Sequence, residues 1–438
     1  MNDMRQASLA APKSSDPDAA ATEHKRRHPR PSGPVGVLDI GTTKIICMIG
    51  RCESDLSLRI TGFGWERARG VRAGSVLDLE AAEQAIRTAV SHAELEAGTR
   101  LRAVTVNLSA GAPESRLFNV QWPVGGRAVT EADIRQVVAE GRGRAESPGR
   151  SIIHALPLGF ATDEAEGSDD PRGLFCETLG ARLHVVDAVT TALRTLDATL
   201  ARCDLEIASL VSAPLAAGMA TLVEDERQLG VTVLDMGGGT TGMAVFAEGH
   251  LLHTAQLPVG GVHVTNDLAR GLATSVTNAE RLKVLFGSAS ASPDDDREVV
   301  PVQHVGEDEG HITQVPRSAI VRIIRPRVEE TFELMRDRIA ASGLGRAAGQ
   351  TVVLTGGASQ LPGIRETASR LLGRQVRLAR PARLAGMPER AGGPGFATAT
   401  GLFAWAAGEG RRLADIDLEA DAPRGMFARL AHFIRTRL

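Results

Sequence analysis

Apolar and polar positions along the chain form two kinds of pattern, which alternate with each other. Short aliphatic runs, such as 35–39, 45–49 and 231–234, have the length and residue types of buried strands. Segments such as 77–95 and about 317–341 instead repeat apolar residues every three to four positions, which predicts helices. Strands that alternate with helices indicate an α/β architecture.

The same patterns place further elements along the chain, and Pro326 predicts a kink or a boundary in the long helix. We expect a strand at 101–108, another that meets two glycines at 351–357, helices near 130–141, 262–272, 278–286 and 395–407, and a polar loop at 288–312. Residues 109–184 differ because prolines and glycines interrupt them, which indicates an inserted subdomain.

Two segments nearly two hundred residues apart share one design. In "VGVLDIGTTKIICMIG" (35–50) and "VTVLDMGGGTTGMAVF" (231–246), an aliphatic run leads through Asp and Gly to two threonines and a second aliphatic run. Each predicts a strand–turn–strand hairpin whose tip exposes backbone N–H groups. Glycine lets the chain approach anionic oxygens, and threonine hydroxyls add donors. Asp39 and Asp235 end the first strands, where a carboxylate can hold a hydrated Mg²⁺ that bridges phosphates.

Other phosphate-binding loops fit these glycines less well. Gly237, Gly239 and Gly242 match the letters of the G-x-G-x-x-G fingerprint, but that motif opens a helix. Here a strand pattern follows the glycines, and no G-x-x-x-x-G-K-[ST] sequence is present. One such hairpin is most often an ordinary tight β-turn. Two copies with the same order of Asp, Gly and Thr-Thr favour a shared ligand.

The composition of the chain disfavours several classes of binding partner and several kinds of segment. The formal net charge of the 438 residues is −3, so no general basic field favours nucleic acid. The four cysteines lack zinc-ligand spacing and are interpreted as reduced thiols. No stretch approaches the roughly 18 consecutive apolar residues of a membrane span. Residues 1–33 lack the apolar core of a signal peptide and are predicted to form a disordered arm.

The segment "RGMFARLAHFIRTRL" (424–438) predicts a basic amphipathic helix after an acidic linker at 408–423. At 100° per residue, its apolar stripe contains Phe427, Leu430, Ile434 and Leu438. Arg429 lies opposite, while Arg435 and Arg437 flank the stripe, where their stems can extend past the apolar boundary. Such a helix binds the interface of an anionic lipid leaflet. The alternative is a terminal helix that docks on its own core.

At the two hairpins the chain resembles the actin/sugar-kinase/heat-shock-protein-70 superfamily. The resemblance implies two like domains that face each other, with ATP and Mg²⁺ between the hairpins. It also implies an adenosine loop, matched by "VVLTGGASQLPGI" (352–364), and a Gly-Gly helix entry near the phosphates in "VGGVHVTNDLA" (259–269). Glu280 and Lys283, one helical turn apart, would reach the ribose and base, whereas a surface ion pair is the simpler interpretation. The implied nucleotide contacts are Gly41, Thr42, Thr43, Lys44, Gly237, Gly238, Gly239, Thr240, Thr241, Gly260, Gly261, Glu280, Lys283, Gly356 and Gly357.

Within that superfamily the chain resembles the FtsA family of bacterial cell-division proteins, from about residue 35 onward. The segments "SIIHALPLGF", "ERLKVLFGSA" and "VVLTGGASQLPG" carry this resemblance. It implies an actin-like two-domain α/β fold with an inserted 1C-type subdomain and a C-terminal amphipathic helix. The expected division is a first domain at 34–79, 185–210 and 381–407, an insert at 80–184, a second domain at 211–258 and 331–380, and its subdomain 2B at 259–330.

The same resemblance implies a function. Such a protein would tether FtsZ filaments to the cytoplasmic face of the inner membrane at the division septum, form protofilaments, and help to recruit later division proteins through the insert. The C-terminal peptide of FtsZ would bind subdomain 2B, where Arg322 and Arg325 are candidate contacts. A solvated helix face that carries some arginines is the alternative for these two residues.

Ala213 bears on catalysis. At the matching place the heat-shock relatives have a Glu and actin has a Gln that orients the attacking water, whereas this chain has "LVSAPLAAGMA". Because water positioning is a large part of phosphoryl-transfer catalysis, Ala213 predicts slow ATP hydrolysis at best. It also disfavours a small-molecule kinase of the same fold, which needs a carboxylate base. A PilM-like pilus-assembly protein, which shares the insert, is the other alternative.

Overall fold

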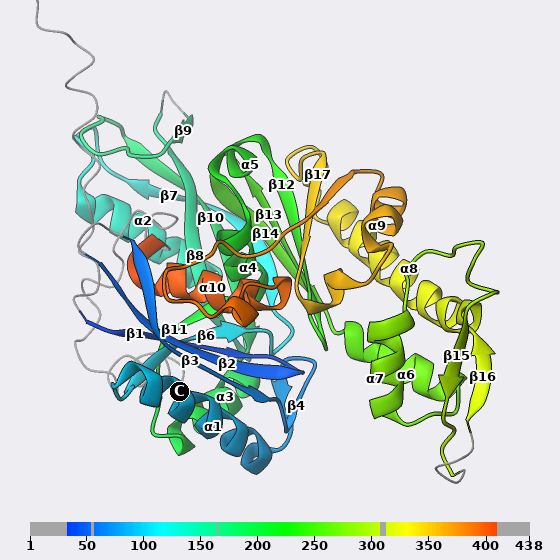
Figure 1. Ribbon diagram of the computed structural model, residues 1–438. Coiled ribbons are helices and arrows are strands. Elements are labelled where there is room, and N and C mark those ends of the chain that lie inside the picture. Colours follow the sequence, from blue (N-terminus) through cyan, green and yellow to red (C-terminus); the bar gives the residue numbers. More distant parts are fainter. Residues whose placement is uncertain (1–32, 54–56, 164–165, 307–311, 410–438) are drawn as a thin grey trace, which may run out of the picture.

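The computed structural model describes residues 33–53, 57–163, 166–306 and 312–409 (Figure 1). Two five-stranded sheets in it share one topology. In each sheet three consecutive strands of the chain pair antiparallel, each with the next. The first of the three also pairs parallel, on its other side, with a strand that follows much later. The first sheet contains β1 (Val35–Ile40), β2 (Lys44–Cys52), β3 (Leu58–Arg67), β6 (Ala103–Leu108) and β11 (Glu206–Ser212). The predicted α/β class and the first hairpin are confirmed.

The second sheet repeats this order with five later strands. These strands are β12 (Val231–Met236), β13 (Thr241–Ala247), β14 (His250–Leu257), β17 (Thr351–Thr355) and β18 (Gln375–Leu378). β12 and β13 form the second predicted hairpin, with Asp235 opposite Gly242. Both hairpins therefore lie at the centre of their sheets, because each first strand also pairs with a parallel neighbour.

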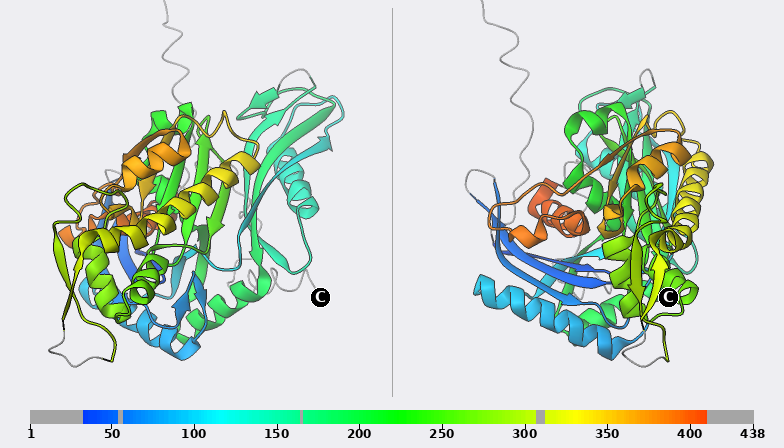
Figure 2. Two further views of the ribbon diagram at one scale, coloured as in Figure 1. Left: turned by 90° about the vertical axis from the view of Figure 1, so that its right-hand side faces the viewer. Right: turned by 45° about the vertical axis from the view of Figure 1, so that its right-hand side comes forward.

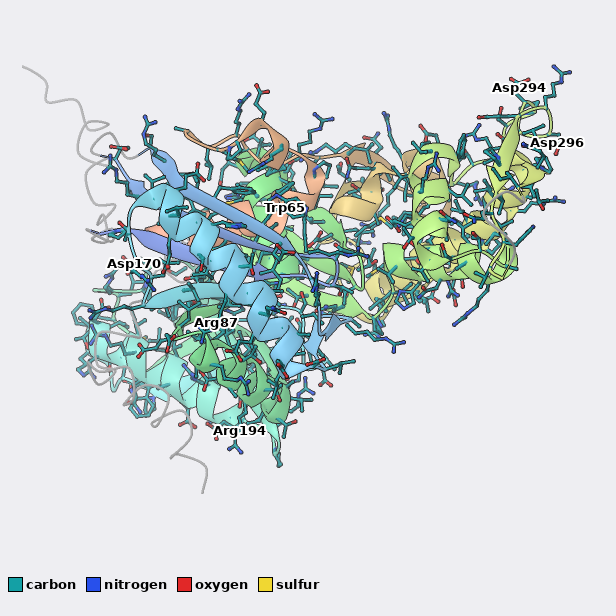
Figure 3. The ribbon with its side chains drawn as sticks, turned by 60° about the horizontal axis from the view of Figure 1, so that its bottom comes forward. Trp65, Arg87, Asp170, Arg194, Asp294 and Asp296 are labelled. Carbon is teal, nitrogen blue, oxygen red and sulfur yellow. The ribbon has the colours of Figure 1, made fainter. Side chains whose placement is uncertain are left out.

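Helix α1 (Leu79–Ala97) covers one face of the first sheet. Its first turn is capped by the Asp78 carboxylate, which accepts the Ala81 N–H, and it ends at Gly98 in the left-handed region, φ 60°. Gly64 on β3 leaves no room for a side chain, because a Cβ there would overlap the Ala89 carbonyl. Arg87 on the outer face pairs with Glu83 at 3.0 Å (Figure 3). α3 (Thr190–Arg202) packs beside α1 in the same core.

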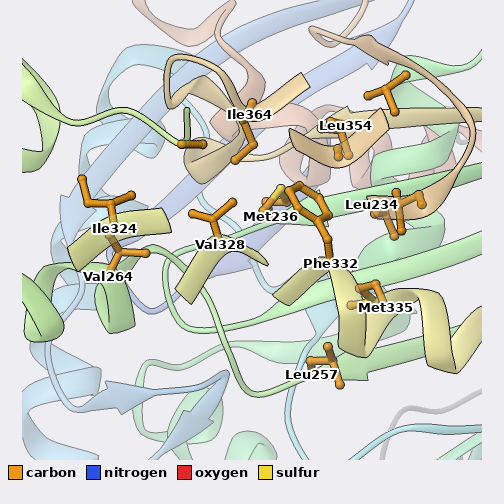
Figure 4. Close-up of a cluster of buried hydrophobic side chains, with 14 of the residues drawn as sticks. Leu234, Met236, Leu257, Val264, Ile324, Val328, Phe332, Met335, Leu354 and Ile364 are labelled. Carbon is orange, nitrogen blue, oxygen red and sulfur yellow. The ribbon is translucent and has the colours of Figure 1, made fainter. Parts of the chain in front are cut away.

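Helix α8 (Arg317–Ala341) covers the outer face of the second sheet with α9 (Ile364–Leu372). Phe332 is fully buried in this core (Figure 4). The predicted limits of the long helix are confirmed, and it runs through Pro326 without a boundary. Ile324 and Val328, on either side of the proline, face the same core. Packing on both turns thus outweighs the backbone hydrogen bond that proline cannot donate.

Two helices lie between the sheets: α4 (Ala213–Thr221) and α10 (Ala397–Ala404). One core surrounds them and takes Val37 from the first sheet and Phe246 from the second. At their crossing a Cβ on Gly401 would overlap the Ala216 carbonyl, so the two backbones are in contact. Figure 2 shows this central layer from two further sides. The central helices therefore couple the two halves of the molecule.

The insert has a sheet and a core of its own. Its sheet contains β7 (Glu114–Pro123), β8 (Arg150–Ala161), β9 (Glu166–Ser168) and β10 (Thr178–Val189), covered by α2 (Glu131–Arg144). Thr130 and Asp133 close a capping box at the start of α2. The insert begins at about residue 110, as the composition of 109–184 indicated, and not at residue 80 as the family resemblance implied, because β6 belongs to the first sheet and α1 packs on it.

The remaining elements lie along the second domain, except for one short hairpin of the first. That hairpin is β4 (Val71–Arg72) with β5 (Ser75–Val76), and the others are α5 (Glu224–Leu229), α6 (Gly261–Gly271), α7 (Val276–Phe286), β15 (Val299–Val302) and β16 (Thr313–Pro316). The predicted polar loop at 288–312 thus contains a strand, β15, in which buried Val300 and Val302 alternate with exposed residues. The expected end of subdomain 2B at residue 330 falls inside α8.

Candidate functional site

The two hairpins are built alike at their tips. Asp39 and Asp235 are the penultimate residues of β1 and β12. In the first turn the Gly41 N–H donates to the Lys44 carbonyl at 3.0 Å, and in the second the Gly237 N–H donates to the Thr240 carbonyl at 2.8 Å. The repeated order Asp-x-Gly thus produces the same turn bond in both copies.

The tips of the hairpins touch each other. A Cβ on Gly238 would overlap the Thr43 side chain, and a Cβ on Gly239 would overlap Thr42. Only glycine permits this approach, because any other residue would push the tips apart. The threonine pair of the first domain therefore faces the glycine run of the second.

Asp39 and Asp235 both lie beneath the hairpin tips, where their carboxyl groups are buried close to each other. Burial raises the pKa of Asp39 to about 7, and the nearby Asp235 carboxylate raises it further. Burial also raises the pKa of Asp235 to about 6, while the hydrogen bond that Thr398 donates to it at 2.9 Å acts in the opposite direction. Lys44 favours the charged form of both carboxyl groups. Two buried carboxyl groups near one lysine form a site suited to a cation.

Besides the two aspartates, an aromatic ring positions the Lys44 side chain. Its Nζ lies 3.6 Å from the centroid of the Phe396 ring, in a cation–π contact. Burial lowers the pKa of Lys44, and the two carboxylates counteract this effect. The ammonium group is thereby fixed between the aspartates and a segment 350 residues later in the chain, close to Gly395.

A glycine pair forms the third side of the site. Gly356 follows β17 with φ 87°, in the left-handed region, and a Cβ there would overlap the Asp235 carboxylate. Its N–H donates to the Pro394 carbonyl at 3.2 Å. Gly357 opens a short 3-10 turn that leads to α9. The strand that meets two glycines, predicted for 351–357, is therefore confirmed.

These elements enclose a cleft of about 650 Å³, open mouth included. Predicted residues that line it are Asp39, Gly41, Thr42, Thr43, Lys44, Asp235, Gly237, Gly238, Gly239, Thr240, Gly356 and Gly357. Lining residues outside the prediction include Asn107, Ser109, Gly395 and Thr398. Asn107 accepts the Ile40 N–H at 2.8 Å and so holds the first hairpin. An amide side chain near the end of the largely apolar run 103–108 was its signal.

Five predicted contacts lie outside the cleft lining. The Thr241 hydroxyl is buried in β13 and donates to the Val259 carbonyl at 2.8 Å. Gly260 and Gly261 begin α6, and the Gly261 N–H donates to the Gly237 carbonyl at 3.0 Å. Lys283 pairs with Glu280 at 2.7 Å and also donates to the Gly261 carbonyl at 3.1 Å. In this conformation these residues support the second hairpin from behind.

Ala213 opens α4 and lines the cleft, where it offers a methyl group only. The two candidate partner residues lie on α8. Arg322 is exposed, and Arg325 pairs with Glu329 at 3.4 Å. Both lie on the first half of the helix, Arg322 on the side opposite the buried Ile324 and Arg325 at the edge of the buried face.

The predicted C-terminal helix lies outside the described residues, as do Phe427, Arg429, Leu430, Ile434, Arg435, Arg437 and Leu438. Most of the predicted N-terminal arm, 1–32, also lies outside them. Among the helices that the structure describes, none has the length and apolar character to cross a membrane.

Two like sheets, central helices and facing hairpins define an actin-like fold. A family model described as "Cell division protein FtsA" matches residues 232–401, and one described as "SHS2 domain inserted in FTSA" matches residues 111–187. FtsA of Agrobacterium fabrum (strain C58) is 44% identical over 405 residues, 90% of each chain. FtsA of Escherichia coli (strain K12) is 31% identical over 373 residues, 84% of this chain and 88% of its own. The chain belongs to the FtsA family of cell-division proteins.

Solved structures show the same fold in more distant proteins. The PilM–PilN type IV pilus biogenesis complex aligns with 86% of this chain and 99% of its own, with a TM-score of 0.60 and 20% identity. MreB5 of Spiroplasma citri bound to ADP aligns with 87% and 98%, with a TM-score of 0.51 and 12% identity. At these identities the likeness shows the fold alone. It therefore does not favour the pilus-assembly alternative over the cell-division family.

Proposed function

We propose that the cleft binds Mg-ATP and that the two aspartates hold the metal. The observation that carries this proposal is the pair Asp39 and Asp235, buried beneath two glycine-rich tips at equivalent strand ends. Within the described parts of the chain no three His, Cys, Asp or Glu side chains gather into a metal site. Mg²⁺ commonly binds one or two carboxylates and completes its shell with water and phosphate oxygens. Two carboxylates thus fit a metal that arrives with a nucleotide.

Each side of the cleft then has a separate role. Backbone N–H groups of residues 42–43 and 238–240 would donate to phosphate oxygens, and the Lys44 ammonium would neutralise phosphate charge. Gly356 and Gly357 would let the nucleoside lie against the backbone. Bound Mg²⁺ would neutralise the charge of the phosphates. Because the tips come from different domains, nucleotide would favour one relative position of the two halves.

Hydrolysis should be slow. A methyl group at residue 213 can neither accept a proton nor orient a water molecule, and Asn107, a neutral polar residue of the same cleft, is committed to the Ile40 backbone. ATP would then act mainly as a ligand that controls conformation and assembly. A small-molecule kinase is disfavoured for the same reason, since its acceptor hydroxyl needs a base.

In the cell, the protein would tether FtsZ filaments to the cytoplasmic face of the membrane at the division septum. Membership of the FtsA family supports this role. Residues 424–438 would attach to anionic lipid, and the C-terminal peptide of FtsZ would bind the second domain near Arg322 and Arg325. The insert, which projects as a separate sheet, would serve self-assembly and the recruitment of later division proteins. Polymerisation would multiply the weak single anchors.

The nucleotide proposal is tested by Asp235→Ala. Isothermal titration with Mg-ATP should show no binding to this variant, and its far-ultraviolet circular dichroism should match that of the unaltered protein. Asp225→Ala, at an exposed site on α5, is the matched control and should bind normally. Unchanged affinity in Asp235→Ala would place the metal or the nucleotide elsewhere.

A further inference from the structure

A second pocket lies on the far side of the hairpin tips. It occupies about 550 Å³, open mouth included, between the β4–β5 turn of the first domain and α6 of the second. Figure 1 shows β4 on the side of the first domain that faces α6. Thr42 and Gly239 line both this pocket and the cleft. Because these two residues touch each other, the tips form a wall between the two spaces.

The turn that closes this pocket also reaches the cleft. Ala73 and Gly74 both have positive φ, 47° and 79°, which forms a tight turn between β4 and β5. The Gly74 N–H donates to the Thr42 hydroxyl at 3.4 Å, and Gly74 lines the cleft while Ala73 lines the second pocket. The turn therefore holds Arg72 next to the tip of the first hairpin.

The charges of the second pocket do not balance. Arg327 is neutralised, since it pairs with Asp267 at 2.7 Å and with Glu330. Arg72 and Arg270 also line the pocket, and among the residues that the structure describes neither has a carboxylate partner. This distinguishes them from Arg87, Arg116, Arg150 and Arg317, which are all paired. Two guanidinium groups, one from each domain, are left to face the same space.

Neutral donors accompany these arginines. His263 Nδ1 accepts the Gly260 N–H at 3.1 Å, so in the neutral ring the proton is on Nε2. The Asn266 side chain lines the pocket and has no hydrogen-bond partner in the described part of the chain. The one acid in the lining, Asp267, is occupied by Arg327. The unused polar groups are thus mainly donors, and their natural ligand is an anion.

We propose that this pocket binds a tetrahedral oxyanion of the phosphate class, between Arg72 of the first domain and Arg270 of the second. Guanidinium groups recognise such anions through paired hydrogen bonds. The choice of phosphate rests on the proposed function, because the wall of the pocket is the back of the tips that would bind nucleotide phosphates. An anion held from both sides would favour the closed position of the two domains.

The test measures binding of inorganic phosphate to the full chain by equilibrium dialysis with radiolabelled phosphate. A saturating, non-hydrolysable Mg-ATP analogue keeps phosphate out of the cleft, because its γ-phosphate group fills the position that ADP would leave open. The unaltered protein should bind phosphate, and Arg72→Gln and Arg270→Gln should each weaken binding by about tenfold or more. Arg365→Gln, which removes an exposed arginine of α9 outside both pockets, is the control and should bind normally. Sulfate should compete with phosphate, whereas chloride at equal ionic strength should not.

Three outcomes would overturn the proposal: no phosphate binding with the Mg-ATP analogue present, equal binding by Arg72→Gln, Arg270→Gln and Arg365→Gln, or displacement of phosphate by a glutamate-rich peptide at concentrations where sulfate fails. The last would assign the pocket to an acidic protein partner. If the Mg-ATP analogue itself does not bind, the proposed function fails. The dependence of phosphate binding on Arg72 and Arg270 without nucleotide then still decides the pocket.

Discussion

At the scale of single residues, burial controls the chemistry of the cleft. The pKa of Asp39 is raised to about 7 and that of Asp235 to about 6, mainly because the charged forms are removed from water. The folded, ligand-free protein therefore keeps protons that the unfolded chain releases above its ordinary pKa of 3.8. Between about pH 4 and pH 7 the native state binds more protons, so the contribution of these groups to the free energy of unfolding falls as pH rises.

This shift predicts the effect of Asp39→Asn. Near pH 8 the variant lacks a charge that is costly to bury, so the ligand-free protein should gain stability, on the order of 1–2 kcal/mol. Near pH 4 the native Asp39 is already protonated, and the gain should disappear. Urea unfolding at both pH values measures the difference. Asp225→Asn, at an exposed site, should give no such gain, and lower stability of Asp39→Asn at pH 8 would contradict the argument.

The side chain at residue 213 is predicted to limit hydrolysis. Ala213 lines the cleft, so a longer polar group there can reach its contents. Ala213→Gln or Ala213→Glu should raise phosphate release by roughly tenfold or more, with little change in ATP affinity. Ala213→Met, similar in size to Gln but without its amide, should not. Turnover by the unaltered protein near the roughly 1–100 s⁻¹ of kinases would show that another residue orients the water.

At the scale of elements, the two faces of α8 have different roles. Its inner face buries Ile324, Val328 and Phe332 against the second sheet, which keeps the helix continuous through Pro326. Its outer face presents Arg322, which has no acidic partner within the described residues, and Arg325, which Glu329 partly neutralises. A partner that carries negative charge would therefore meet Arg322 first.

Charge reversal tests this surface. Arg322→Glu combined with Arg325→Glu should weaken binding of the FtsZ C-terminal peptide by about tenfold and remove most of its salt dependence. Fluorescence anisotropy with a labelled peptide at several salt concentrations measures both effects. Arg336→Glu, exposed near the other end of α8, serves as the control. Binding that stays intact and equally salt-sensitive would show that these arginines only face solvent and do not contact the peptide.

At the scale of the whole molecule, the proposed function depends on joining a folded body to a membrane. The body has two sheets held together by α4 and α10, so we expect it to be stable without residues 424–438. Deletion of that segment should leave a soluble protein that binds ATP but no longer sediments with anionic liposomes. Sedimentation with and without ATP, with FtsZ added in parallel, measures attachment. Full-length protein that remains in the supernatant at polymerising concentration would contradict the anchor.

Point variants separate the membrane anchor from a docked helix. Phe427→Glu or Ile434→Glu should abolish most vesicle binding, since each forfeits roughly 1.5–3 kcal/mol of apolar burial. Replacement of Arg429, Arg435 and Arg437 by Gln should flatten the salt dependence and spare the apolar part of binding. A helix docked on its own core predicts the reverse, namely Glu variants that unfold or aggregate.

The sequence by itself was sufficient to predict features that depend on residues close together along the chain. Both hairpins, their Asp-x-Gly turns and the limits of α8 follow from hydrophobic period and glycine stereochemistry, which act over a few residues. Twelve predicted residues, from Asp39 to Gly357, line the cleft because they belong to these local units. The superfamily resemblance rested on the two hairpins.

Only the tertiary structure decided which distant residues share the cleft. Asn107 and Thr398 join it because a parallel strand and a central helix bring them beside β1 and β12. Thr241 and Lys283 are turned away, since their polar atoms find backbone carbonyls elsewhere. The raised pKa values of the aspartates and the two unpaired arginines of the second pocket likewise depend on packing across the chain. Sequence period carries no information about such contacts, because they join residues whose separation along the chain is unrelated to their separation in space.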